Sequence, residues 1–292
     1  MAATLIPNAA IRDIQEELHR LDEAAAGADR ETLRTRVQTH LAWIPPEWEA
    51  AAREVMAGLG GRHPSRMILL LPDPDAGRDA IDAEVSVDVF GAAVAGRAVS
   101  TEVIALRLCG VCAAAPASVV SPLVVADLPV FLRWRGPLPF GTPELEQLLD
   151  VADRLIVDSA EWPEPDRALA VLPGLFDRVA VSDIAWARTV PWRLALARRW
   201  PGVAASRRLR VEGPRCEAVL LAGWLRARLG HPFELEHTPG EELTLVEIDG
   251  AAVEPAGNGG ASSADLLSAQ LESFGRDPVY EQAVAAAVSP SA

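Results

Sequence analysis

The stretch RMILLL, residues 66–71, is a short apolar run that stops at Pro72. A run of this length bounded by a proline is typical of a strand buried in a sheet. Two segments that follow alternate apolar and polar residues, VSVDV at 85–89 and IALRL at 104–108, which predicts half-buried strands. Because helical patterns lie on both sides, these strands predict an α/β region that contains a mixed sheet.

Similar patterns predict further elements outward from this region. Thr142 and Pro143 suit the N-cap and first position of a helix, and Gly230 suits a helix end. Small and glycine-rich segments predict a turn at 91–96 and a loop or a reduced hairpin at 251–263. Strands are expected at 130–134, 154–158, 208–211 and 243–248. Helices are expected at 48–59, 144–151, 216–229 and 265–274, and at 168–180 with an interruption near Pro173 and Gly174. The alanine-rich residues after the last helix are expected to be frayed.

The N-terminal segment 11–41 has apolar residues at helical spacing, with a loop expected at 24–29. It predicts a helical arm that packs on the body of the protein or on a partner. Pro163 and Pro165 lie among acidic residues and mark a junction. We therefore expect two α/β domains with a mixed sheet in the N-terminal one, plus the arm. The expected bounds are 1–60 for the helical arm, 61–165 for the N-terminal α/β domain and 166–292 for the C-terminal α+β domain.

Composition restricts the class of protein. The chain has 292 residues, of which 50% are hydrophobic, so it can bury a core and is not disordered throughout. Its formal net charge of −14 repels a phosphate backbone, so nucleic acid is not an expected partner. A local arginine patch could still bind an anion, because net charge describes the whole chain and not one face.

Residue usage excludes several kinds of catalytic site. All 27 basic residues are arginine, so the chain has no lysine for a Schiff base or a P-loop. Tyr280 is the one tyrosine, which excludes dehydrogenases that use a Tyr and Lys pair. The nucleophile-elbow, zinc-protease and P-loop motifs are absent from the sequence. We predict no catalytic residue, no metal site and no cofactor.

The sequence predicts a cytoplasmic protein that does not bind membranes. Residues 1–10 lack the basic and apolar regions of a signal peptide. The longest apolar stretch, 119–132, is interrupted by prolines and an aspartate, and no run reaches the roughly 18 apolar residues of a membrane span. Three cysteines are too few for a disulfide scaffold of this length.

Cys109 and Cys112 form a C-G-V-C motif just after a predicted strand. Such a pair can act as a redox switch or as half of a metal site. Two small buried residues at a strand end are the favoured interpretation, because free cysteine packs as a small hydrophobe. Both interpretations stay open at this point.

Tryptophan and arginine recur together in FLRWRG at 131–136, WAR at 186–188 and WR at 192–193. Eight tryptophans against one tyrosine is a skewed usage. Trp and Arg anchor many protein interfaces, and Arg also binds phosphates and carboxylates. A tryptophan core with arginine at its edge explains the pattern equally well. The candidate partner contacts are Trp134, Arg135, Asp183, Trp186, Arg188, Trp192 and Arg193.

These stretches and several others resemble one family, the OpcA proteins, in the order of that family's signature stretches. The matching stretches are HPSRMILL at 63–70, DLPVFLRWRG at 127–136, DRLIVDS at 153–159, DIAWARTVPWR at 183–193, LLAGWLRARLG at 220–230 and DPVYEQAV at 277–284. The resemblance implies a two-domain α/β protein without catalytic activity. It also implies a protein that binds glucose-6-phosphate dehydrogenase and promotes its assembly or active oligomer in the oxidative pentose phosphate pathway.

Two other functions remain possible on the residues alone. One is a sugar-phosphate sensor or enzyme that holds its anion with four arginines, Arg133, Arg135, Arg188 and Arg193. The other is a redox switch at Cys109 and Cys112.

Overall fold

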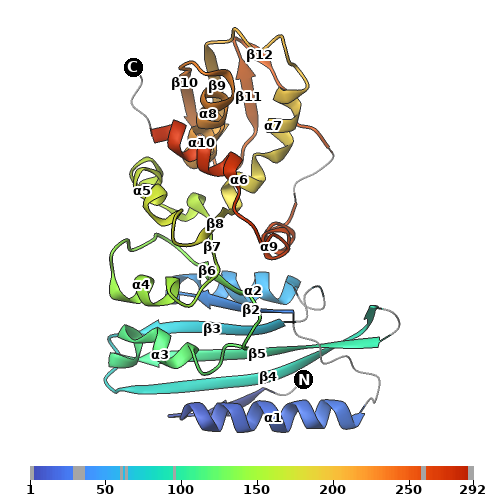
Figure 1. The fold of residues 1–292 in the computed structure, drawn as a ribbon, viewed down its shortest axis with the longest axis vertical. Coiled ribbons are helices and arrows are strands. Elements are labelled where there is room, and N and C mark those ends of the chain that lie inside the picture. Colours follow the sequence, from blue (N-terminus) through green and yellow to red (C-terminus); the bar gives the residue numbers. More distant parts are fainter. Residues whose placement is uncertain are drawn as a thin grey trace. The chain divides into compact units, whose positions relative to one another are not determined.

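The chain forms two compact units in a computed structural model that describes residues 3–28, 37–59, 62, 65–94, 97–257 and 261–288 (Figure 1). Unit 1 contains Met1–Ile156 and Ser263–Glu272, and unit 2 contains Val157–Ser262 and Ser273–Ala292. A short C-terminal segment thus returns to unit 1 before the chain ends in unit 2. The predicted domain bounds at 60 and 165 stay a prediction.

A mixed sheet forms the centre of unit 1. Its strands are β1 (Thr4–Ile6), β2 (Gln38–Trp43), β3 (Ser65–Asp73), β4 (Ala80–Val94), β5 (Arg97–Cys109), β6 (Val130–Trp134) and β7 (Arg154–Val157). They lie in the order β1-β4-β5-β3-β2-β6-β7. The β1–β4 and β4–β5 pairs are antiparallel, and the pairs from β5 through β3, β2 and β6 to β7 are parallel. The predicted α/β fold with a mixed sheet is confirmed.

Helices pack on this sheet because its central strands are apolar on both faces, as parallel strands require. They are α1 (Ile11–Ala28), α2 (Glu49–Leu59), α3 (Pro116–Val120), α4 (Pro143–Leu149) and α9 (Ser263–Leu271). α1 contacts β4 and buries Ile14 and Leu18. α2 covers a cluster that includes Ala42, Leu69 and Ala105 from neighbouring strands. α9 packs on α2.

Unit 2 is an α+β body with its own small sheet. The sheet consists of β9 (Arg208–Gly213), β10 (Glu234–Pro239), β11 (Leu245–Ile248) and β12 (Ala251–Ala252), in the order β10-β9-β11-β12. Strand β8 (Ala180–Asp183) and the helices α5 (Pro165–Val171), α6 (Ile184–Arg188), α7 (Val190–Ala197), α8 (Arg215–Leu229) and α10 (Pro278–Val288) complete the unit. The core lies between the sheet, α7 and α8 and includes Trp192, Leu196, Val211 and Leu221.

α8 and α10 pack closely because small residues line their contact. A Cβ placed on Gly223 of α8 would lie 2.2 Å from the carbonyl oxygen of Ala283 in α10, so the close approach requires glycine. α8 ends as predicted at Gly230, whose φ of 71° is the left-handed conformation of a helix C-cap. Within the described residues, no helix combines the length and the apolar character needed to cross a bilayer.

Several predicted elements are wrong at the N-terminus. The helix expected up to residue 41 is replaced by strand β2, which is buried along its whole length and therefore shows no alternation. The loop expected at 24–29 is helical up to Ala28, and residues 29–36 lie outside the described residues. In the segment 91–96, where a turn was expected, β4 continues to Val94, and residues 95–96 are outside the described ones.

Other differences lie near the C-terminus and at helix ends. The helix expected at 168–180 begins earlier, at Pro165, and ends at Val171. Its end lies just before the interruption predicted at Pro173, and the α-helix does not resume after the 3-10 turn Leu172–Leu175. α9 ends at Leu271, and the residues expected to be frayed contain α10, which buries Tyr280 and Val284. Strand β10 was not expected. Thr142 lies at the N-cap of α4, but its side chain makes no capping hydrogen bond.

Candidate functional site

Asp183, at the junction of β8 and α6, is the centre of a buried hydrogen-bond network in unit 2. The backbone N–H of Ala185 donates to Asp183 Oδ1 at 2.9 Å, which is the N-cap of α6. Ser159 donates its backbone N–H to Oδ1 at 3.0 Å and its hydroxyl to Oδ2 at 2.7 Å. The Tyr280 hydroxyl donates to Oδ2 at 3.2 Å. Burial, and then the charge of Asp158, raise the pKa of Asp183 to about 6.

Arg188, at the end of α6, is held by two acidic residues. Its guanidinium makes a bidentate pair with Asp158, with Nη1 2.9 Å from Oδ1 and Nη2 2.5 Å from Oδ2. Nη1 also lies 3.4 Å from Oε1 of Glu217 in α8. Burial raises the pKa of Glu217 to about 7, although the Arg188 charge opposes the shift. Arg188 therefore links two elements and is already bound to internal carboxylates.

Trp186 joins α6 to α10. Its indole Nε1 donates to Asp277 Oδ2 at 3.0 Å, and Asp277 Oδ1 in turn accepts the N–H of Tyr280 at 3.0 Å. The Trp186 ring lies 5.8 Å from the Tyr280 ring, and the Arg193 guanidinium lies 3.4 Å from the indole centroid. Burial lowers the pKa of Arg193 to about 10, with a smaller opposing effect of Asp277. The predicted residues Asp183, Trp186, Arg188 and Arg193 thus meet in one network.

Helix α7 presents its tryptophan to the core and aliphatic residues to the surface. Trp192 is buried beside Leu196, whereas Val190 and Leu194 on the other side of the helix are 41% and 49% exposed. Trp200, just after the helix, is 62% exposed. The sequence left open whether the tryptophans of the segment 183–193 belong to an interface or to a core, and both of them are buried. The role of these residues as partner contacts stays a proposal.

The other Trp/Arg stretch lies in unit 1 at the end of β6. Trp134 is buried and stacks on Trp43, with ring centroids 5.0 Å apart and an angle of 15° between the planes. The Arg135 guanidinium lies 4.9 Å from the centroid of Trp48. Gly136 has a φ of 78°, and a Cβ there would meet Trp48 Nε1 at 2.7 Å, so the turn requires glycine. These contacts build the edge of the unit 1 core.

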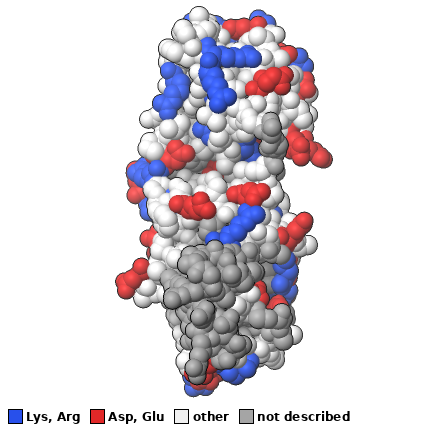
Figure 2. Space-filling view, turned by 90° about the vertical axis from the view of Figure 1, so that its right-hand side faces the viewer, with Lys and Arg blue, Asp and Glu red and all other residues white. Residues whose placement is uncertain are grey.

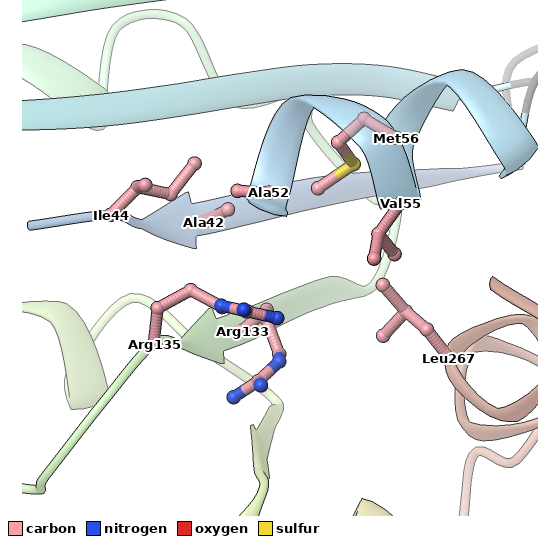
Figure 3. A pocket seen from close by; sticks show the side chains of 8 residues that line it. All are labelled: Ala42, Ile44, Ala52, Val55, Met56, Arg133, Arg135 and Leu267. Atoms are coloured by element: carbon pink, nitrogen blue, oxygen red, sulfur yellow. The ribbon is translucent and has the colours of Figure 1, made fainter. Parts of the chain in front are cut away.

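A small cavity lies beside this stretch, between β2, β6, α2 and α9 (Figure 3). Arg133 of β6 and Arg135, which follows the strand, line it and face aliphatic side chains. The cavity volume of about 10 Å³ is at the limit for a single water molecule, which is far too small for a sugar phosphate. The residues around it are Ala42, Ile44, Ala52, Val55, Met56, Arg133, Arg135 and Leu267.

A larger cavity, about 290 Å³ in volume, opens in unit 2 beside the Asp183 network. Ser159, Arg215 and Cys216 are among the residues that line it. Arg215 is paired with Asp166 through two contacts, at 3.0 and 2.9 Å. Burial raises the pKa of the Cys216 thiol well above its ordinary range, so this thiol is not a reactive thiolate.

The cysteine pair lies at the end of β5. Cys109 is buried and Cys112 is half-buried, and both are free thiols. Burial is the largest cause that raises the pKa of Cys109, whereas reactive cysteines have a lowered pKa. The motif continues into a 3-10 turn, Gly110–Ala114, and not into an α-helix. The redox role stays a prediction. Within the described ranges, no group of three or more His, Cys, Asp or Glu is placed to hold a metal.

Sequence reasoning missed the residues that complete the unit 2 network. These residues lie in elements that are distant in the sequence, and so their proximity is not visible in local patterns. A signal was present, because the stretches 153–159 and 277–284 resemble family signatures and contain four of them. The missed members are Asp158, Ser159, Glu217, Asp277 and Tyr280.

Two family models match this chain in sequence order. The model described as the glucose-6-phosphate dehydrogenase subunit N-terminal domain matches residues 57–173. The model described as the C-terminal domain of the same subunit matches residues 179–284. Together the two ranges cover more than half of the chain.

Three cyanobacterial proteins with the name OxPP cycle protein OpcA are similar to the chain. Synechocystis sp. has one that is 26% identical over 133 residues, covering 42% of this chain and 28% of the relative. The Nostoc punctiforme protein is 25% identical over 172 residues, covering 52% and 37%. The Synechococcus elongatus protein is 25% identical over 244 residues, covering 74% and 53%. The chain thus spans about half or less of the length of these relatives. On these matches, the chain belongs to the OpcA family of glucose-6-phosphate dehydrogenase assembly proteins.

Proposed function

We propose that this protein is a non-catalytic partner of glucose-6-phosphate dehydrogenase, which binds the enzyme in the cytoplasm and promotes its active oligomer in the oxidative pentose phosphate pathway. The observation that carries the proposal is the pair of family matches, because both models describe domains of a subunit of that enzyme. The match in both halves of the chain supports a protein that keeps the family's two-domain organisation.

A partner of this kind needs no chemistry of its own. It has to bind the active oligomer of the enzyme better than the inactive form, and a preference of about 1.4 kcal/mol shifts that equilibrium tenfold. The hydrogen bonds and ion pairs of unit 2 are consistent with a protein that acts by binding and not by catalysis. The polar groups of the Trp/Arg segment are used internally, where Asp183 caps α6 and Arg188 bridges Asp158 to Glu217. They fix the shape of the unit.

The sugar-phosphate alternative is less well supported by the same contacts. An anion clamp needs guanidinium groups that can turn toward a ligand. Arg188 is committed to two carboxylates, and Arg193 stacks on Trp186 and donates to Thr189 Oγ1 at 2.9 Å. We therefore keep contact with an enzyme as the proposed function.

The test uses the purified chain and the purified dehydrogenase of the same organism. The oligomeric state of the enzyme is measured by light scattering, and its substrate saturation curve is measured with and without the chain. We expect the chain to bind, to increase the active oligomer and to change the apparent substrate affinity. Absence of binding and of any effect on the enzyme would contradict the proposal. Turnover of substrate by the chain alone would contradict its non-catalytic part.

A further inference from the structure

A long segment of unit 2 contains no acidic residue, although the chain as a whole is strongly acidic. Between Asp183 and Glu212 the sequence has no Asp or Glu, in a chain with 41 acidic residues and a net charge of −14. This acid-free segment, residues 184–211, includes all of α7. It contains seven of the 27 arginines: Arg188, Arg193, Arg198, Arg199, Arg207, Arg208 and Arg210.

The arginines in and just after α7 have no carboxylate partner among the described residues. Arg193 stacks on Trp186, and Arg199 Nη2 donates to the carbonyl oxygen of Ala252 at 2.6 Å. Arg198 is exposed, and its side chain makes no ion pair or hydrogen bond within the described ranges. Figure 2 shows several basic side chains on one face of unit 2, among uncharged residues and some acidic ones. Within the described residues, no carboxylate pairs with Arg193, Arg198 or Arg199, whereas Asp158 and Glu217 neutralise the charge of Arg188.

The same segment exposes an apolar stripe. Residues 190, 194 and 197 follow the i, i+4, i+7 spacing, so they lie on one side of α7, opposite Trp192 and Leu196 in the core. At 100° per residue, Arg193 and Arg198 lie on the two flanks of the stripe. Val190, Leu194 and Trp200, which follows the helix closely in sequence, are three of the nine large hydrophobic residues that are exposed among the described residues.

We infer that the outer face of α7 together with Trp200, which we call the α7 face, is a docking surface for an acidic protein surface. An apolar centre with arginines at its rim complements a partner patch whose apolar centre is surrounded by carboxylates. Trp200 and the exposed Arg198 are of the residue types that anchor such contacts, whereas the Arg193 guanidinium is held against Trp186 and adds only its charge. The inference rests on the proposed function, in which the partner surface belongs to the dehydrogenase.

A protein is favoured over the two other occupants of a basic and apolar face. The net charge of −14 repels the phosphates of a nucleic acid. An interfacial membrane helix has a long apolar face, whereas α7 spans only Val190–Ala197 and already buries one side in the core.

The test measures the affinity of the dehydrogenase for variants of the exposed residues. Leu194→Asp removes the centre of the stripe, and Arg198→Glu reverses one rim charge. Val171→Asp is the matched control for the first, because Val171 is also 49% exposed and lies in α5 of the same unit. Arg167→Glu is the control for the second, because the Arg167 side chain is 85% exposed. A circular dichroism melt of each variant verifies that it is folded.

We expect Leu194→Asp to weaken the affinity by about 30-fold or more, and Arg198→Glu by about tenfold, while both controls stay within about twofold of the wild type. Arg198→Glu is also expected to slow association and to reduce the salt dependence of binding between about 0.05 M and about 0.3 M. If the wild type binds and both variants bind like their controls, the α7 face is not the docking surface, although the proposed function stands.

Two other outcomes overturn the inference in different ways. If the wild-type chain does not bind the enzyme at all, the inference and the proposed function both fail. If the wild type binds vesicles of phosphatidylglycerol and phosphatidylcholine, and Leu194→Asp abolishes that binding but leaves enzyme binding unchanged, the face contacts lipid and not protein.

Discussion

At the scale of single residues, buried charge governs how unit 2 responds to pH. Burial holds the pKa of Glu217 at about 7 and that of Asp183 at about 6, above the ordinary values of 4.5 and 3.8. The folded state therefore binds protons more tightly than the unfolded state does. This contribution to stability is fully present below the unfolded pKa values and is lost as the pH rises through the folded ones. Deprotonation consequently destabilises unit 2 between about pH 4 and about pH 7.

Glu217→Gln is expected to flatten this dependence. The wild type should lose on the order of 2–3 kcal/mol of unfolding free energy from this group between pH 4.5 and pH 8, and the variant should lose much less. Urea unfolding across that pH range measures the effect. Glu234→Gln serves as the control, because the Glu234 side chain is 72% exposed. Equal pH slopes for Glu217→Gln and the wild type would show that Glu217 is not the titrating group.

The Tyr280 hydroxyl also contributes to the stability of unit 2. It donates to the buried Asp183 carboxylate at 3.2 Å, and its removal leaves that carboxylate with fewer donors. Tyr280→Phe keeps the ring packing against Trp186 and should lower the unfolding free energy by about 1–3 kcal/mol. Chemical denaturation of both proteins at the same pH checks this value. A change below about 0.5 kcal/mol would mean that the hydrogen bond contributes little.

The buried tryptophans change how a partner experiment should be designed. Trp186 and Trp192 are each almost fully buried, and truncation of such residues costs about 3–5 kcal/mol. The variant Trp186→Ala/Trp192→Ala is therefore expected to melt far below the wild type, and a loss of binding in it would report unfolding. A double variant with the wild-type melting temperature would contradict the packing described here.

At the scale of elements, the contact between α8 and α10 depends on one missing side chain. A Cβ on Gly223 would meet Ala283 O at 2.2 Å and Ala287 Cβ at 2.7 Å. Gly223→Ala should thus destabilise the protein by about 1–3 kcal/mol, because the helices must separate. Gly174→Ala is the matched control, since nothing lies within 4 Å of a Cβ there. Thermal melts compare the two, and equal melting temperatures would contradict the close helix contact.

The elements that the sequence predicts well are those whose pattern is local. β3 contains an uninterrupted apolar run, β4 and β5 alternate, and α8 combines a long, mostly apolar stretch with a glycine at its end. β2 and α10 were missed because tertiary contacts decide them. β2 is buried on both faces and so resembles no single period, and the alanines of α10 form a helix contact that composition alone does not reveal.

The sequence predicts the candidate site with the same limit, because contacts between distant segments are not visible in local patterns. The sequence brings Trp and Arg together in the segment 183–193, and four residues of this segment share a network. Helical periodicity shows which residues share a side of a helix, but it does not show which side is buried. Asp277 and Tyr280, which lie far along the chain, decide it for α6, and core residues of β9 and α8 decide it for α7. The exposed face of α7 therefore became apparent only from the structure.

At the scale of the whole molecule, charge is distributed unevenly. The chain carries a net charge of −14, whereas residues 184–211 carry only positive side-chain charges. Arg188, Arg208 and Arg210 are paired with carboxylates from outside this segment, so the uncompensated charge lies at α7 and just after it. A local positive surface attracts an acidic partner even though the chain as a whole is negative. Salt screens this attraction, so binding should weaken with salt, whereas the net charge alone predicts that salt strengthens it. Added salt should weaken binding to the dehydrogenase, although it would screen repulsion between two acidic proteins. Binding that strengthens with salt would contradict a docking surface of this charge.

The decisive measurement is sedimentation velocity of the dehydrogenase alone, with the wild-type chain and with the Leu194→Asp variant, followed by activity assays on the same samples. If the protein is an assembly partner that acts through the α7 face, the wild type will co-sediment with the enzyme and increase its active oligomer, and the variant will do neither while remaining folded. An enzyme that sediments and turns over identically in all three samples would contradict a role in its assembly.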